Sequence, residues 1–112
     1  MAKVIITNTL KNEIQKRFKQ ESIKIFELMK TLEKNPHKGK AIGNVANIII
    51  KEIKYKNYRF YFITDGHMLK FAASEEVTNL IIRFVKMSDK KNQQKTINEI
   101  KNILKTLGED DF

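Results

Sequence analysis

The chain has 112 residues and a formal net charge of +9, from 22 basic and 13 acidic side chains. Its length fits a single domain with one hydrophobic core. The absence of cysteine excludes disulfides, thiolate nucleophiles and cysteine-based zinc sites, and the two histidines are far apart in the sequence, so neither a metal site nor a cofactor is expected.

The charge is concentrated in the body of the chain. Residues 109–112 (EDDF) hold three of the acids, so residues 1–108 carry +12 (22 minus 10). Such an excess attracts a phosphate backbone, although a lysine-rich composition can also reflect genome bias or heat adaptation. No apolar stretch is long enough to span a bilayer and none precedes the first strand-like residues, which leads us to expect a soluble, cytoplasmic protein without membrane contact.

The first third of the chain predicts a strand and two helices. Residues 3–7 (KVIIT) read as a strand, and the polar residues that follow are typical of a helix N-cap. Two helices in a hairpin are predicted by apolar residues that recur every three or four positions: Leu10, Ile14 and Phe18, then Ile25, Leu28, Met29 and Leu32. Asn35-Pro36 ends the second helix, and residues 37–44 read as a loop.

The middle of the chain predicts a β-meander of residues 45–54, 58–64, 67–73 and 80–86. Asp65-Gly66 is a strong hairpin signal between the second and third of these strands. A last helix, capped by Ser88 or Asp89, would end at Gly108. The expected fold is a single α+β domain, residues 1–108, in which a small, antiparallel-rich sheet has its helices on one face: the N-terminal helical hairpin and a C-terminal helix. Residues 109–112 would form an acidic tail.

Strand pairing sorts the charges of the segment KEIKYKNYRFYFITDG (51–66). A turn at Lys56-Asn57 pairs Tyr55 with Tyr58 and Ile53 with Phe60 on one face. The same turn pairs Lys54 with Arg59 and Glu52 with Tyr61 on the other face. The predicted second hairpin adds apolar pairs (Phe62 with Leu69, Phe60 with Phe71) and places Lys70 opposite Tyr61. Arg83, Lys86 and Lys90 are expected beside them. This pattern suits an ordinary solvated sheet face, and an aromatic among cations also suits RNA recognition.

The segments 51–66 and 81–94 (IIRFVKMSDKKNQQ), with the order of the predicted elements, resemble the RelE/ParE superfamily of bacterial and archaeal toxins. The phage-derived, HigB-type branch is the most similar. Its Glu-hydrophobic-Arg step is matched by residues 52–54, with lysine in place of arginine. Its Tyr-Arg-x-x-Tyr-like strand is matched by residues 58–62, and its Phe-x-Lys-Lys-Thr-x-Lys stretch by residues 84–90.

The resemblance implies the toxin of a type II toxin–antitoxin system, acting as an mRNA endoribonuclease (mRNA interferase), often on the ribosome. Its partners would be mRNA, the ribosome and an antitoxin protein, and a homodimer stays open. Cleavage by 2′-OH attack on the adjacent phosphate needs a base, a cation and an acid. The catalytic candidates are Glu52 or Lys54 as the base, with Arg59 and Arg83 for the phosphate charge. RNA-binding candidates are Lys51, Tyr61, Lys70, Lys86 and Lys90, and Tyr61 would stack a base.

Two departures leave other functions open. Many active relatives carry a Tyr or His near the C-terminal end, whereas residues 92–102 here contain neither, and Met87 replaces the second lysine of the motif. His67 could replace the missing proton donor, but a single histidine at a turn is normally a solvated surface residue. The alternatives are a ParE-like, non-enzymatic topoisomerase inhibitor and a degenerate RNA-binding module.

The stretch GEDDF (108–112) has two interpretations. The simpler one is a solubilising tail without contacts, because terminal charge runs are usually disordered. In the other, Asp110, Asp111 and Phe112 fold back, or reach a second copy, and occupy the phosphate-binding face.

Overall fold

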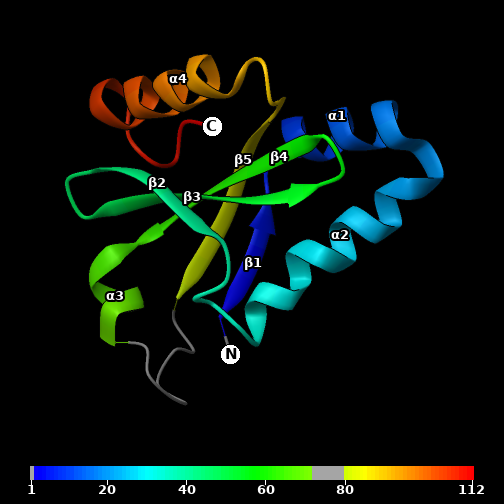
Figure 1. The fold of residues 1–112 in the computed structure, drawn as a ribbon. Helices are drawn as coiled ribbons and strands as arrows, with labels where there is room; N and C mark the ends of the chain where they lie inside the picture. The colour runs from blue at the N-terminus through cyan, green and yellow to red at the C-terminus, as the bar shows by residue number, and fades with distance from the viewer. Residues whose placement is uncertain (1, 72–79) are drawn as a thin grey trace.

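A computed structural model describes residues 2–71 and 80–112 (Figure 1). Its elements are, in order, β1 (Lys3–Ile6), α1 (Asn8–Phe18), η1 (Lys19–Glu21), α2 (Ser22–Lys30), η2 (Thr31–Glu33), β2 (Lys40–Val45), β3 (Ile48–Tyr55), β4 (Tyr58–Asp65), α3 (Gly66–Phe71), β5 (Ile81–Asp89) and α4 (Gln93–Thr106). In this part of the chain no helix is long and apolar enough to cross a membrane.

The described strands form one five-stranded sheet in the order β1-β5-β4-β3-β2. β1 runs parallel to β5, and the other neighbouring strands are antiparallel. The α+β class and the antiparallel-rich sheet are therefore as predicted. The parallel β1 places the start of the chain beside its last strand.

One face of the sheet is covered by the two N-terminal helices. Thr7 caps α1, since its Oγ1 accepts a hydrogen bond from the Leu10 amide at 3.3 Å. The apolar positions of both helices then face the sheet. The resulting core includes Leu10, Ile14, Ile25, Met29 and Leu32 from the helices, and Phe60, Phe62, Ile82 and Phe84 from the strands. The burial predicted for Phe60, Phe62, Leu69 and Phe84 is confirmed, whereas the side chain of Phe71 lies outside the described residues.

The opposite face is covered by α4. Figure 1 shows α2 and α4 on opposite sides of the sheet. A second cluster joins Ile97 and Ile100 of α4 to the sheet residues Ile50, Tyr61, Ile63 and Val85. The expectation that all helices share one face is therefore wrong. The physical reason is that both faces of β3, β4 and β5 carry apolar side chains, and each needs a cover.

The β3–β4 register is the predicted one. Lys54 pairs with Arg59, Glu52 with Tyr61, and Ile53 with Phe60. The turn at Lys56-Asn57 is also confirmed, with Lys56 in the left-handed region at φ 54°. Because side chains alternate along a strand, this register fixes which residues share a face with Arg59.

The predicted hairpin at Asp65-Gly66 is wrong. Asp65 instead caps α3, since its Oδ1 accepts hydrogen bonds from the amides of His67 (2.9 Å) and Met68 (3.1 Å). The strand predicted for 67–73 is a helix as far as Phe71, and residues 72 and 73 lie outside the described part. The pairs Phe62–Leu69, Phe60–Phe71 and Tyr61–Lys70 do not form, because β4 pairs with β3 and β5.

The loop predicted for 37–44 contains an additional strand. Residues 40–45 form β2, which pairs with β3 and has a β-bulge between Ala41 and Gly43. The bulge accommodates a glycine inside a strand, which explains why this stretch resembles a loop.

Candidate nucleic-acid interface

The face of the sheet beneath the start of α4 holds a buried polar cluster, which consists of Glu52, Arg59, Tyr61, Ser88 and Gln93. The side chains of Arg59 and Glu52 are only 10% and 2% exposed, and Arg59 Nε lies 3.5 Å from Glu52 Oε2. Arg59 Nε makes no hydrogen bond to the described residues, so the two groups form an ion pair without a hydrogen bond. Gln93 Nε2 donates to the two oxygens of Glu52, at 3.3 and 3.4 Å. Glu52 is thereby held between Arg59 and the first turn of α4.

Tyr61 lies fully inside this cluster, although the sequence suggests a base-stacking role. Its exposed fraction is 0%, and its hydroxyl is 2.7 Å from Ser88 Oγ. Burial raises the pKa of the Tyr61 hydroxyl, and the nearby Glu52 carboxylate raises it further, while the Ser88 hydrogen bond acts in the opposite direction. Tyr61 shares the face of Arg59, as predicted, but α4 covers its ring. In this conformation Tyr61 has no free surface on which a base could stack.

Lys51 lies on the other face of the sheet, away from Arg59. It is 5% exposed, its Nζ donates to the His37 carbonyl at 2.9 Å, and it lies 5.9 Å from the centre of the Phe62 ring. Burial lowers the pKa of the Lys51 amine. The structure therefore separates Lys51 from the other RNA-binding candidates.

Exposed cations surround the buried polar cluster at the end of the sheet that carries the β3–β4 turn. We call this group the cationic rim, and its members are Arg17, Lys54, Lys90 and Lys95, whereas Arg59 belongs to the buried polar cluster. Lys54 is exposed opposite the nearly buried Arg59, and Lys90 is exposed just after β5. Arg17 joins the rim from α1, since its Nη1 donates to the Tyr58 hydroxyl at 3.3 Å and its guanidinium lies 5.5 Å from the centre of the Tyr58 ring.

A pocket of about 210 Å³ opens between α1 and the start of α4, and two members of the rim, Arg17 and Lys95, line it. Its lining includes Arg17, Tyr58, Ser88 and Lys95, together with the acids Glu13, Asp89 and Glu99. Asp89 fixes the start of α4, because its Oδ1 accepts hydrogen bonds from the backbone and side-chain amides of Asn92, both at 2.9 Å. These hydrogen bonds lower the pKa of the Asp89 carboxyl. The contact between Arg17 and Tyr58 in this pocket is not predicted from the sequence, because Arg17 looks like an ordinary surface residue of a helix.

Arg83 and Lys86 lie farther along the same face. Arg83 pairs with Ile63, four residues along β4 from Arg59, which separates the two arginines by roughly 13 Å along the strand. The two guanidinium groups are therefore not arranged around one phosphate. Lys86 Nζ lies 4.0 Å from Glu99 of α4, and Arg83 contacts the segment 109–110.

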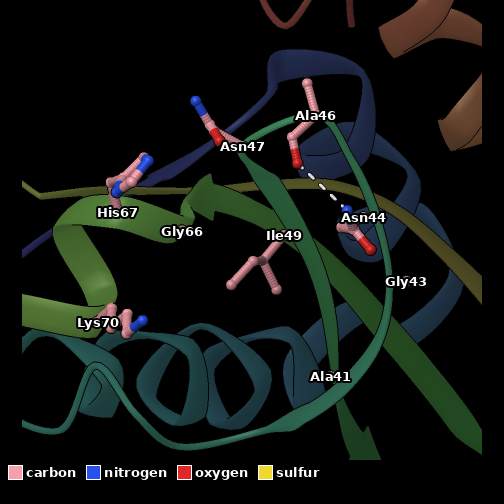
Figure 2. A pocket seen from close by; sticks show the side chains of 9 residues that line it. All are labelled: Ala41, Gly43, Asn44, Ala46, Asn47, Ile49, Gly66, His67 and Lys70. Atoms are coloured by element: carbon pink, nitrogen blue, oxygen red, sulfur yellow. Dashed lines mark hydrogen bonds between the residues drawn. The ribbon is translucent and has the colours of Figure 1, made fainter.

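Lys70 and His67 lie apart from the cationic rim, on α3. Both line a pocket of about 440 Å³ between α3 and the β2–β3 hairpin. Figure 2 shows the side chain of Ile49 between the hairpin and α3. His67 and Lys70 project from α3. The expected position of Lys70 opposite Tyr61 is therefore wrong, for the reason given for the Asp65-Gly66 hairpin.

Residues 2–71 and 80–112 contain no group of three or more histidine or acidic side chains placed to hold a metal ion. In comparisons with known proteins, no family model matches the chain, and no match is found among the curated proteins or the solved structures.

Proposed function

We propose that this protein is an mRNA endoribonuclease, the toxin of a type II toxin–antitoxin system that acts in the cytoplasm on ribosome-bound mRNA. The observation that carries the proposal is the cationic rim, which gathers exposed cations from α1, β3, the β5–α4 turn and α4 at one end of the sheet. Clustered surface cations attract a phosphate backbone whatever its sequence. Tyr58 lines the pocket beside Arg17, on the face of β4 opposite to Arg59, and supplies an aromatic ring of the kind that single-stranded RNA uses for stacking.

The buried ion pair supports a division of roles between Glu52 and Arg59. The Arg59 side chain is only 10% exposed, so its permanent positive charge stabilises the negative charge of the phosphorane from beneath the surface. Glu52 is 2% exposed, so it positions Arg59 instead of reaching a ribose. Lys54 is exposed on the neighbouring strand and is the better candidate for the base.

In this mechanism the neutral amine form of Lys54 takes the proton of the 2′-hydroxyl and becomes an ammonium, and the 2′-oxygen forms a bond to the adjacent phosphorus. The bond from phosphorus to the 5′-oxygen breaks, and the leaving oxygen takes a proton from water. The products are a 2′,3′-cyclic phosphate and a 5′-hydroxyl end. Arg59 neutralises the charge that develops on the phosphate oxygens.

The same structure favours one alternative, an RNA-binding module without cleavage. Two residues to which the resemblance gives direct contact with RNA, Glu52 and Tyr61, have 2% and 0% exposure. A protein that only binds RNA would need the cationic rim but no reachable base.

The two functions differ in what they do to mRNA on translating ribosomes. The purified protein is incubated with a translation extract, and new mRNA 5′-ends are mapped for wild type, Lys54→Ala and Lys70→Ala. Lys54→Ala and Lys70→Ala each remove one positive charge from an exposed lysine, the first in β3 and the second in α3, so they are matched controls. We expect new ends with wild type and Lys70→Ala and their loss with Lys54→Ala. RNA binding without new ends would select the module, and neither binding nor cleavage would overturn both functions.

A further inference from the structure

The segment 109–112 folds back onto the sheet. Gly108 ends α4 with φ +111°, a conformation that favours glycine, and its amide donates to the Ile103 carbonyl at 2.9 Å. The chain turns again where the Asp111 amide lies 3.4 Å from the Gly108 carbonyl. This course directs the acidic residues toward β5.

The segment is attached at two points. Arg83 Nη1 donates to the Glu109 carbonyl and to Asp110 Oδ1, both at 2.9 Å. The Phe112 side chain packs against the cluster that α4 forms with the sheet. Asp111, in contrast, makes no ion pair with a described residue.

The contacted surface is the part of this face that α4 leaves open. Ile81 of β5 is 45% exposed, and the side chain of Arg83 is 24% exposed even with the segment in place. Lys3 and Ile5 of β1 pair with Ile81 and Arg83, and Lys86 lies on the same strand. Without the segment, Arg83 would be open to solvent near Lys86, and the two continue a row of cations whose first member, Arg59, is covered by α4.

The register between β4 and β5 places these cations at even intervals along the sheet. Arg59, Tyr61 and Ile63 are successive positions of β4 on one face, and Ser88, Lys86 and Arg83 lie opposite them. Arg59, Lys86 and Arg83 thus follow one another at intervals of roughly 7 Å along the strand direction.

We propose that the segment 109–112 is an internal competitor for RNA, in which the Asp110 carboxylate occupies the position at Arg83 that an RNA phosphate would otherwise take. The inference rests on the proposed function for the identity of the ligand. The tether from α4 keeps the carboxylate at an effective concentration of about millimolar, so a phosphate has to displace it. The Asp110 side chain is 87% exposed and its ion pair is correspondingly weak, so RNA can displace it and the competition is modest.

The chain provides a matched pair of variants. Asp110→Asn and Asp111→Asn both raise the net charge by one, and only Asp110 contacts Arg83. Binding of a fluorescent single-stranded oligoribonucleotide is measured at constant salt for wild type and both variants. We expect Asp110→Asn to bind about two- to fivefold more tightly than Asp111→Asn.

A second comparison separates occupancy from charge. Phe112→Ala removes the apolar attachment without changing the charge, and Leu107→Ala, at a 66% exposed position, is its control. We expect tighter binding for Phe112→Ala alone. In an Arg83→Gln background the gains of Asp110→Asn over Asp111→Asn, and of Phe112→Ala over Leu107→Ala, should disappear.

The outcomes distinguish this inference from the proposed function. Binding that is equal for Asp110→Asn and Asp111→Asn, or gains that persist with Arg83→Gln, would overturn the competitor while leaving RNA binding intact. Absence of RNA binding in every variant would instead overturn the proposed function, and the competitor with it.

Discussion

The buried pair of Glu52 and Arg59 makes the replacement Glu52→Ala a severe one. The replacement removes the counter-charge from an arginine whose side chain is 10% exposed, and it removes the acceptor of Gln93. Breaking a buried ion pair by deleting one partner costs about 3–5 kcal/mol, because the other charge stays buried without compensation. A domain of this kind has a total stability of about 5–15 kcal/mol, so the variant should lose a large part of it.

Urea unfolding followed by circular dichroism measures this loss. With a slope of about 1–3 kcal/mol per molar urea, the midpoint should fall by at least about 1 M. Replacing both charges together, with Glu52→Leu and Arg59→Met, should restore most of the stability, because an apolar pair of similar size carries no desolvation cost. Glu99→Ala is the control, since its carboxylate is 47% exposed and 4.0 Å from Lys86 Nζ. A midpoint for Glu52→Ala close to that of Glu99→Ala would refute the reasoning, as would a double variant no more stable than the single one.

Three further predictions follow from single contacts. Tyr61→Phe should cost about 1 kcal/mol near pH 8 through the lost Ser88 contact. The pKa of Tyr61 is raised in the folded protein, so the unfolded chain loses this proton first and the free energy of unfolding falls as the pH rises above about 10. The difference in unfolding free energy between wild type and Tyr61→Phe should therefore shrink at pH 11. A difference that stays constant would contradict this prediction. Gly39→Ala should cost about 1–3 kcal/mol in chemical denaturation, because φ is +101° and a Cβ would lie 3.0 Å from both the Glu52 carbonyl and the Phe62 ring; an unchanged midpoint would contradict the close approach. Asp65→Ala should lose about 0.5–2 kcal/mol of α3 stability and speed hydrogen exchange at the amides of His67 and Met68, whereas unchanged exchange would mean that Asp65 is not the cap.

The sequence predicts the β3–β4 pairing well because local rules determine it. A slip of one residue would move Phe60 out of the core and Arg59 into it, so alternation leaves one acceptable register. The same alternation correctly places Glu52, Lys54 and Tyr61 on the face of Arg59. The first strand, the positions of both N-terminal helices and the end of α4 at Gly108 also follow from local patterns.

Asp65-Gly66 shows where local rules become ambiguous. An aspartate next to a glycine suits a hairpin turn, and an aspartate also suits the start of a helix, where its carboxylate accepts free amides. The segment that follows is short and apolar, and such segments do not distinguish a strand from a helix. The structure resolves the ambiguity through β5, which occupies the edge of β4 that the predicted hairpin would have used.

The burial of the candidate site could not be predicted, because it depends on distant contacts. Periodicity identifies the apolar side of α4 but not the face of the sheet against which it packs. With α4 on the Arg59 face, Tyr61 becomes a core residue and Glu52 a buried carboxylate. Lys51 is a similar case, because a lysine in a strand is expected to be solvated, whereas here its amine donates to the carbonyl of His37, a residue distant in the sequence.

The location of RNA binding is the central claim, and an NMR titration of the protein with a single-stranded oligoribonucleotide tests it most directly. We predict amide shift changes concentrated in residues 54–59 and 89–95, around the cationic rim, which weaken steeply as salt is raised. The pocket between α3 and the β2–β3 hairpin, with His67 and Lys70, should show little change. Shift changes confined to that pocket, or no changes at low salt, would contradict the account.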